Sequence, residues 1–304
     1  MRRMTMSLQE EMLSCARKAG GALRTREHRE RIVREFCCYL RQQNIQTRHV
    51  RDIKVRQIQA YVGSMNEREL TLRTMQNSLA ALRTVLTAAG RDAFAEHRDL
   101  SNAALGISGA SRDGTHAPVT EDFYLQVRES ILKYDPTGGI AAVMGLQRVF
   151  GLRSLEALCA QGDTLRRWEK EIRRGKIEVI KGTKGGRPRN VTVVNPKIAQ
   201  IALREAMDVL QATDQDYLVI GKSHTLKSGY DRYHRCLRKY GLRGPSSSHG
   251  LRYAWAHQAI LYYREERGFS GREALAAVAQ DLGHGDGRGR YVAQVYYGRR
   301  KEGA

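Results

Sequence analysis

The segment SSSHGLRYAWAHQAI at residues 246–260 places a histidine and an arginine three residues apart at the start of an apolar run. The serines are typical of a helix N-terminus, so His249 and Arg252 would share one face of the first turn. Two cationic groups are unfavourable there, because the helix dipole is already positive at that end. An anion bound by both side chains would offset this cost. We therefore expect an anion-binding site at this position.

The whole chain carries a matching excess of positive charge. Its 304 residues include 52 Lys and Arg against 32 Asp and Glu, a net charge of +20. Residues 1–114 contain 20 basic and 12 acidic residues, so the excess extends over both halves of the chain. Such an excess indicates a polyanionic partner, and it favours nucleic acid over a protein that is merely basic and soluble.

Two further clusters contain cations beside glycines. In VFGLRSLEALC, Arg153 follows Gly151, and Glu156 stands three residues later. That spacing by itself equally fits an ion pair within one helix. In KGTKGGRPR at residues 181–189, four cations surround a glycine-rich turn. This turn is either a basic loop that contacts nucleic acid or a support from which one lysine reaches into a cleft as an acid.

The C-terminal segment AQDLGHGDGRGRYVAQVYYGRR combines a histidine with three tyrosines. His284 is flanked by glycines, and Tyr291, Tyr296 and Tyr297 follow among basic residues. A single tyrosine near a C-terminus is usually a packing residue. Here the preceding glycine-rich stretch could move, so a chemical role for one phenol is also open.

The sequence gives no sign of a metal or nucleotide cofactor. In IGKSH, the glycine that a phosphate-binding loop needs five positions before Gly221 is Asp216. The five cysteines include no C-x-x-C pair, so His234 and Cys236 are expected to be structural. The chain also lacks a signal-peptide core and a run of about 20 apolar residues. We expect a cytoplasmic, nucleoid-associated protein that uses neither ATP nor metal and has no membrane partner.

The apolar spacing predicts the elements that must position these residues. The predicted fold is mainly α with a small antiparallel β-sheet, formed by alternating runs at 176–181 and 189–194 around the glycine-rich turn. Gly, Ser, Asn and Ala dominate residues 100–120, which is typical of a linker. The expected organisation is an N-terminal extension at 1–19, a helical domain at 20–105, a linker at 106–117 and a second domain at 118–304.

Taken in chain order, five motifs resemble the tyrosine recombinases, or phage integrase family. The motifs are G-L-R-x-x-E, the hairpin T-K-G-G-R-x-R, H-x-x-R, L-G-H and a near-terminal tyrosine, and they cover about residues 118–298. The basic helical region fits the core-binding domain of that family. Each motif alone is unspecific, but together they form a strong signal. The resemblance implies a two-domain, C-shaped DNA clamp.

The resemblance also implies roles for the cationic motifs. Arg153 and Arg252 match the two arginines that clamp the scissile phosphate. Lys184 matches the hairpin lysine, with Lys181 as the alternative if the register differs. Glu156 matches an acidic position that supports an arginine.

The same comparison assigns the remaining catalytic positions. His249 and His284 match the histidines of H-x-x-R and L-G-H. Tyr296 would be the nucleophile, because VAQVYYG resembles the family's ending V-T-x-V-Y-L-G. Tyr297 is the alternative nucleophile, and Tyr291 is a weaker one.

The implied reaction is site-specific cleavage and rejoining of double-stranded DNA through a 3′-phosphotyrosyl intermediate. A phenol can store the energy of the phosphodiester bond in this way. The resemblance implies a tetramer on DNA and leaves room for an accessory DNA-bending or directionality factor. Two other functions stay open: relaxation of DNA as by a type IB topoisomerase, and a catalytically silent DNA-binding or architectural role.

Overall fold

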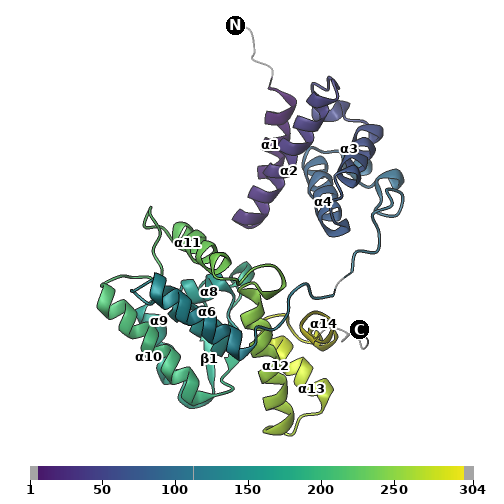
Figure 1. Ribbon diagram of the computed structural model, residues 1–304. Coiled ribbons are helices and arrows are strands. Elements are labelled where there is room, and N and C mark those ends of the chain that lie inside the picture. Colours follow the sequence, from purple (N-terminus) through teal and green to yellow (C-terminus); the bar gives the residue numbers. More distant parts are fainter. Residues whose placement is uncertain (1–5, 112, 298–304) are drawn as a thin grey trace. The chain divides into compact units, whose positions relative to one another are not determined.

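The computed structural model describes residues 6–111 and 113–297, and the chain divides into two compact units, Met1–Ser111 and Arg112–Ala304 (Figure 1). Each unit has its own hydrophobic core. The predicted fold class is confirmed, because helices dominate both units and the sheet found in the described residues has two antiparallel strands. No helix in these ranges is long and apolar enough to cross a membrane.

The first unit is entirely helical in its described part. Its longer helices pack their apolar faces around residues such as Phe36, Tyr61 and Leu82. The elements are α1 (Leu8–Lys18), α2 (Leu23–Gln42), the 3₁₀ turn η1 (Val50–Asp52), α3 (Val55–Glu67), α4 (Leu72–Ala88), α5 (Asp92–Ala95) and the 3₁₀ turn η2 (Arg98–Leu100).

The structure corrects the expected boundary at residue 20. Helix α1 begins with a capping box between Ser7 and Glu10, and its Met12, Leu13 and Ala16 are buried in the core of the first unit. Charged neighbours on the exposed face of α1 obscure this short apolar stripe in the sequence. Residues 8–18 therefore belong to the helical domain and are not an extension.

The second unit is mainly helical and contains the sheet. Most of its helices pack in one core that includes Trp168, Tyr233 and Trp255. Its elements up to the sheet are α6 (Glu121–Tyr134), α7 (Gly139–Phe150), α8 (Ser154–Leu158), α9 (Gly162–Glu171) and the 3₁₀ turn η3 (Ile172–Arg174). After the sheet come α10 (Pro196–Thr213), α11 (Leu226–Lys239), η5 (Gly244–Ser246), α12 (His249–Glu265), α13 (Gly271–Asp281), α14 (Gly289–Val292) and the π-helical turn η6 (Ala293–Tyr297).

The predicted hairpin is present, with shorter strands. Strand β1 (Lys176–Val179) pairs with β2 (Arg189–Thr192), so each ends two residues before its apolar run does. Ile177 lies opposite Val191, and both side chains are buried, as the alternating pattern predicts. The turn between the strands contains a 3₁₀ segment (η4, Lys184–Gly186), which places Lys184 at the tip.

The end of α7 directs the chain toward the functional residues. Gly151 has φ of +58°, and a Cβ added there would lie 2.5 Å from the Trp255 ring. Only glycine permits both this left-handed conformation and this close approach. Arg153 follows two residues later as the N-cap of α8. The G-L-R motif is therefore a sharp helix-to-helix turn packed on α12.

Candidate active site

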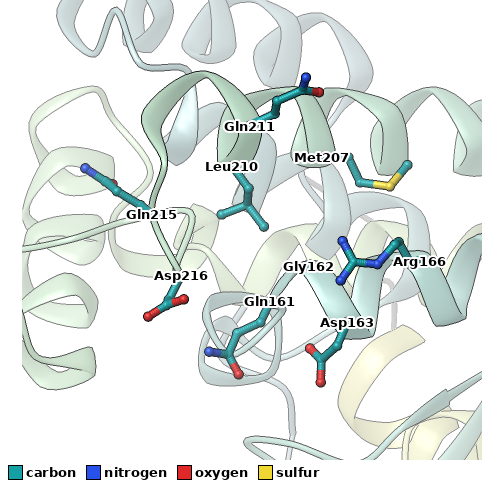
Figure 2. Close-up of a pocket in the computed structure, with 9 residues that line it drawn as sticks. All are labelled: Gln161, Gly162, Asp163, Arg166, Met207, Leu210, Gln211, Gln215 and Asp216. Carbon is teal, nitrogen blue, oxygen red and sulfur yellow. The ribbon is translucent and has the colours of Figure 1, made fainter.

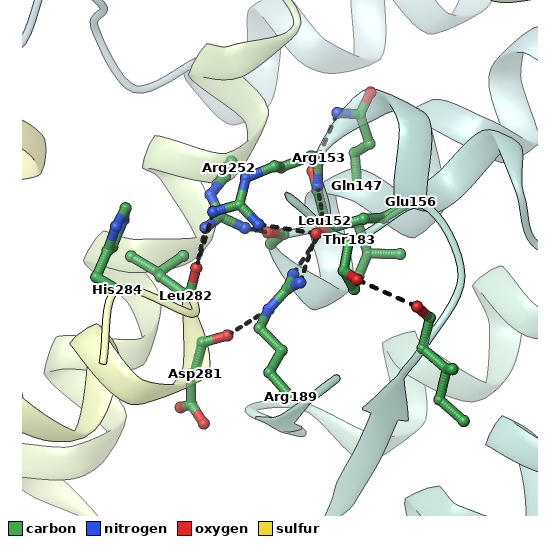
Figure 3. A network of polar contacts seen from close by, with 12 residues as sticks. Gln147, Leu152, Arg153, Glu156, Thr183, Arg189, Arg252, Asp281, Leu282 and His284 are labelled. Carbon is green, nitrogen blue, oxygen red and sulfur yellow. Dashed lines mark hydrogen bonds and ion pairs between the residues drawn. The ribbon is translucent and has the colours of Figure 1, made fainter. Parts of the chain in front are cut away.

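Arg252 is the most buried of the predicted site residues. Its side chain projects from the first turn of α12 and has no exposed surface. Nη1 donates to the Gly151 carbonyl at 2.5 Å, Nη2 donates to the Leu282 carbonyl, and Nε donates to the Tyr296 hydroxyl at 3.2 Å. These three partners come from separate parts of the second unit, so the guanidinium is fixed in orientation. Figure 3 shows its contact with the Leu282 carbonyl.

Arg153 lies beside Arg252 and shares an acceptor with it. Its Nη2 donates to the same Leu282 carbonyl at 3.3 Å, and its Nη1 donates to Glu156 Oε1 at 2.8 Å. The side chain keeps 24% of its surface exposed, whereas Arg252 has none. The two arginines that stand 99 positions apart in the chain therefore form one cationic pair at the end of α13 (Figure 3).

Glu156 is a buried carboxylate that supports two arginines. It accepts from Arg153 and, on both oxygens, from Arg189 of strand β2, at 2.5 and 2.8 Å. Burial raises the pKa of this carboxyl, but the hydrogen bonds and charge of Arg189 outweigh burial and hold it below its ordinary value. Arg189 also donates from Nε to the Asp281 carbonyl at 2.8 Å. Glu156 thus ties α8, the hairpin and α13 together.

Tyr296 meets this cationic pair from the C-terminal side. Its hydroxyl lies 3.2 Å from Arg252 Nε and 3.0 Å from His284 Nε2, and the residue is only 3% exposed. The ring packs on Tyr253, with centroids 4.4 Å apart, and the Tyr296 carbonyl is 2.8 Å from His257 Nε2. The phenol is therefore held against a permanent cation and an imidazole at once.

Both predicted histidines lie where the neutral form of the imidazole is favoured. Burial lowers the pKa of His249 and of His284 to about 3, and the charge of Arg252 adds to the effect on each. A neutral imidazole has one ring nitrogen free to accept a hydrogen bond. His284 Nε2 can therefore accept the proton of the Tyr296 hydroxyl.

A cavity of about 960 Å³ opens in front of these groups. Five predicted site residues line it: Arg153, Lys184, His249, His284 and Tyr296. Arg252 lies directly behind Tyr296, in hydrogen-bond contact with it. The rim adds Lys176 and Arg187. An anion that enters this cavity would meet several donors and cations together.

The two hairpin lysines differ in where they point. Lys184 lines the cavity from the tip of the hairpin. Lys181 instead donates to Gln161 Oε1 at 2.8 Å and pairs with Asp163 at 3.2 Å, outside the cavity lining. Lys184 is thus the hairpin lysine with access to a bound anion.

The comparisons with known proteins agree with this arrangement. The integrase family profile matches residues 106–258, which is half of the chain, and a profile for the phage integrase N-terminal domain matches residues 4–95. The chain is a tyrosine recombinase of the integrase family. The first profile includes Arg153 and Arg252 but ends before Tyr296. The second begins before α1, in line with the corrected boundary.

Solved structures share the fold of this recombinase. A lambda integrase tetramer bound to a Holliday junction is 18% identical, with a TM-score of 0.60 over 99% of this chain and 81% of that one. The Tn1549 transposon integrase in complex with transposon right-end DNA is 14% identical, with a TM-score of 0.58 over 95% of each chain. No curated protein matches the sequence.

The three C-terminal tyrosines of the recombinase occupy different environments. Tyr297 is 45% exposed and stacks on His257, with ring centroids 4.6 Å apart. Tyr291 is 37% exposed and lies at the cavity edge, 4.8 Å from the His284 ring. Only Tyr296, among these three, has its hydroxyl hydrogen-bonded to both Arg252 and His284.

Sequence reasoning missed three residues of this site. In the sequence, Arg189 is noted only as one of the four cations of the hairpin. It stands two positions before Val191, so in strand β2 both side chains point to the buried face. An arginine at a position where the alternation predicts an apolar residue is the feature that could have revealed it. Tyr253, which packs on Tyr296, and His116, whose ring centroid is 5.1 Å from that of His249, carry no local motif. Only the folded chain brings His116 to the site, whereas Tyr253 directly follows Arg252 in the sequence.

A second pocket of about 660 Å³ lies between α9 and α10 (Figure 2). Its lining includes Asp163, Arg166, Met207 and Leu210, and none of the predicted site residues. Across the described parts of the chain, no group of three or more His, Cys, Asp or Glu side chains is placed to hold a metal ion.

Proposed function

We propose that this recombinase cleaves and rejoins DNA at specific sites through a 3′-phosphotyrosyl bond to Tyr296, without a metal ion or ATP. One observation carries the proposal. The Tyr296 hydroxyl contacts Arg252 and His284 at the edge of a cavity that Arg153, Lys184 and His249 also line. A nucleophile, its hydrogen-bond partner, cationic clamps and a proton donor are the parts that such a transesterification requires.

The first step forms the covalent bond to the protein. The Tyr296 oxygen attacks the scissile phosphorus, and its proton passes to Nε2 of His284. An unperturbed phenol has a pKa of about 10, so it needs such a partner at neutral pH. Burial, and after it the neighbouring cations, lower the pKa of His284. The charge of a bound phosphodiester would offset the part that comes from the cations and so favour transfer of the proton to the imidazole.

The two arginines stabilise the charge that develops on the non-bridging oxygens. Each guanidinium presents paired donors and stays protonated throughout. Loss of one such donor typically costs on the order of 3 kcal/mol of activation free energy. His249, beside them on α12, adds a further hydrogen-bonding group. This cationic environment supplies the charge stabilisation that a metal ion provides in other phosphoryl-transfer enzymes.

The second half of the step releases the 5′ end of the DNA. As the bond from phosphorus to the 5′ oxygen breaks, that oxygen takes a proton from the Lys184 ammonium. A lysine suits this role because its ammonium, unlike a guanidinium, can give up a proton. The free 5′ hydroxyl, or one from a second duplex, then attacks the phosphotyrosine and restores Tyr296. The number of phosphodiester bonds is conserved, so no external energy source is needed.

The proposed substrate is double-stranded DNA, and the proposed working form is a tetramer assembled on it. The charge of +20 supports the first part, because neutralised phosphates dominate the affinity of such proteins. The second part follows from the chemistry, since exchange needs two cleaved duplexes. The lambda integrase of similar fold is a tetramer on a Holliday junction. An accessory DNA-bending or directionality factor is compatible with this arrangement.

Covalent capture tests the proposal. The protein is mixed with a pool of nicked duplexes of varied sequence, in EDTA and without ATP. After cleavage, the short fragment that bears the released 5′ hydroxyl diffuses away, so the covalent intermediate accumulates. We expect a DNA adduct that survives denaturation and is lost in Tyr296→Phe. Tyr297→Phe is the matched control and should keep the adduct. Mass spectrometry of the DNA-linked peptide identifies the tyrosine directly.

Other outcomes separate the alternatives. An adduct that persists unchanged in Tyr296→Phe contradicts the proposal, whereas its loss in Tyr297→Phe alone moves the nucleophile by one residue. Relaxation of supercoiled plasmid that lacks any captured site would indicate a topoisomerase. DNA binding with no adduct on any duplex would indicate a silent DNA-binding protein.

A further inference from the structure

The segment from Asp113 to Val119 lies against the turn that carries Tyr296. Asp113 Oδ1 accepts a hydrogen bond from Gln294 Nε2 at 3.0 Å. A Cβ added to Gly114 would lie 1.8 Å from the Val295 carbonyl oxygen and 2.9 Å from the Tyr253 hydroxyl. The Gly114 backbone therefore contacts the residue immediately before Tyr296 and a ring that packs on Tyr296. We call residues 113–119 the strap.

The other end of the strap is fixed to the start of α12. His116 Nδ1 lies 3.1 Å from Ser247 Oγ, and the Ala117 amide donates to the Pro245 carbonyl at 2.9 Å. The Val119 amide donates to the Gly250 carbonyl at 3.1 Å, and the Val119 side chain is buried. These anchors lie in the turn before α12 and in its first residues, beside His249 and Arg252.

His116 completes the connection by ring packing. Its ring centroid is 5.1 Å from that of His249 and 5.8 Å from that of Tyr253, both in edge-on geometry. Tyr253 in turn packs on Tyr296 at 4.4 Å. The strap thus spans from the phosphate-binding end of α12 to the turn that carries the phenol.

The turn that carries Tyr296 is reached through short elements and a glycine-rich loop. Helix α14 is only four residues long, and η6 is a π-helical turn. They follow a loop in which Gly283, Gly285 and Gly287 all have positive φ. Such a connection does little to fix where η6 lies, because glycine leaves the backbone free to adopt many conformations. The placement of Tyr296 therefore depends on what η6 packs against.

We propose that the strap is a positioning element for the nucleophile, with Gly114 and His116 as its positioning residues. This inference rests on the proposed function, because it takes Tyr296 to be the attacking group. Gly114 sets how closely η6 approaches the strap, and His116 holds the strap on the α12 end of the site. Neither residue contacts the Tyr296 hydroxyl in this structure.

Gly114→Ala tests the proposal most directly. The new methyl group would overlap the Val295 carbonyl, so either the strap or η6 must shift. A displacement of about 1 Å at a reacting group can cost about 100-fold in rate. We expect single-turnover adduct formation at saturating DNA to fall by about that factor, with DNA affinity unchanged. The loss of thermal stability should be small beside the loss of rate. Gly271→Ala is the matched control, because a Cβ there meets nothing within 4 Å.

Two variants of His116 separate positioning from contact with DNA. His116→Ala removes the ring and should slow adduct formation, whereas His116→Phe keeps a ring and should restore most of the rate. A rate that Phe does not restore, together with weaker DNA binding, would mean that His116 contacts DNA and does not position η6. This pair keeps the proposal testable if Gly114→Ala fails to fold.

Hydrogen exchange gives a readout that does not depend on cleavage. Amides of residues 292–297 should exchange faster in Gly114→Ala than in wild type or Gly271→Ala. Unchanged exchange and unchanged adduct formation would overturn the positioning role, as would equal losses of binding, stability and rate. If amide exchange is faster in Gly114→Ala but the wild type forms no adduct, the strap does support η6, and it is the proposed function that is refuted.

Discussion

The two halves of the candidate site are built in different ways. The arginine half consists of Arg153, Arg252 and Arg189, held by a buried carboxylate and by main-chain carbonyls at the ends of well-packed helices. The tyrosine half is a four-residue helix and a π-helical turn after a glycine-rich loop. A phosphate clamp gains from being rigid before substrate arrives, because its charges then need no reorganisation. In the proposed reaction the tyrosine attacks the phosphorus, stays bonded to DNA and is then released, so it gains from a support that can move.

This contrast makes a general prediction. Substitutions in the arginine half should lower both the stability of the second unit and the cleavage rate. Substitutions in the tyrosine half, such as Tyr296→Phe and Gly114→Ala, should lower the cleavage rate much more than the stability.

Glu156→Ala should have the largest effect on the arginine half. The carboxylate is 1% exposed and accepts hydrogen bonds from Arg153 and Arg189, so its removal leaves buried guanidinium charge without a partner. Breaking a buried pair in this way costs about 3–5 kcal/mol. Chemical denaturation should report a loss of that order in the free energy of unfolding. A loss below about 1 kcal/mol would show that this half is not held by Glu156.

Arg252→Lys should have the next largest effect, and it should lower the cleavage rate as well as the stability. Lysine keeps the charge but cannot donate to Gly151, Leu282 and Tyr296 from one planar group. We expect single-turnover cleavage to slow by about 3 kcal/mol in activation free energy, together with a lower unfolding temperature. Arg153→Lys is the comparison, and it should affect stability less because Arg153 is partly exposed. A reversed order would contradict the rigid role of Arg252.

The sequence marks the arginine half more directly than the tyrosine half, although it gives no separate role to Arg189. G-L-R-x-x-E and H-x-x-R are short motifs in which the functional residues lie within one turn of each other, so local spacing is informative. The choice between Tyr296 and Tyr297 is not local, because adjacent residues in a helical turn point about 100° apart. Which of them faces His284 depends on how α14 and η6 pack, and no periodicity exists over so few residues.

The sequence also does not predict the position of segments that are held by contacts between distant residues. The strap reads as a linker in the sequence because it is rich in small and polar residues, and only the fold shows that Gly114 lies against Val295. The hairpin, by contrast, was predicted to within two residues at each strand, since alternation reports directly on burial of Ile177 and Val191.

The smallest expected effect concerns pH and the end of α13. Asp281 accepts from the Tyr263 hydroxyl and the Thr192 amide, and burial raises its pKa to about 6. The folded protein therefore binds this proton more tightly than the unfolded chain, whose pKa is near 3.8. This group stabilises the fold fully below about pH 4 and loses that contribution as the pH rises through about 6.

Asp281→Asn isolates this contribution. The amide keeps a similar shape but does not titrate. In the wild type, the free energy of unfolding should fall by at most about 3 kcal/mol between about pH 4 and 6.5 because of this carboxyl, and the variant should lack that decrease. Urea denaturation at each pH measures it. Identical pH profiles for the wild type and the Asp281→Asn variant would mean that the carboxyl is not buried as described.

The carbonyl of Leu282 receives both Arg153 and Arg252. Because this oxygen belongs to the main chain, every amino acid at position 282 would supply it. Substitutions of Leu282 would therefore test only how its side chain packs. The spacing of the two guanidiniums is set by the backbone. A change to the peptide bond itself is needed to weaken that acceptor. Replacing the amide between Leu282 and Gly283 with an ester would weaken the hydrogen bonds of both arginines together.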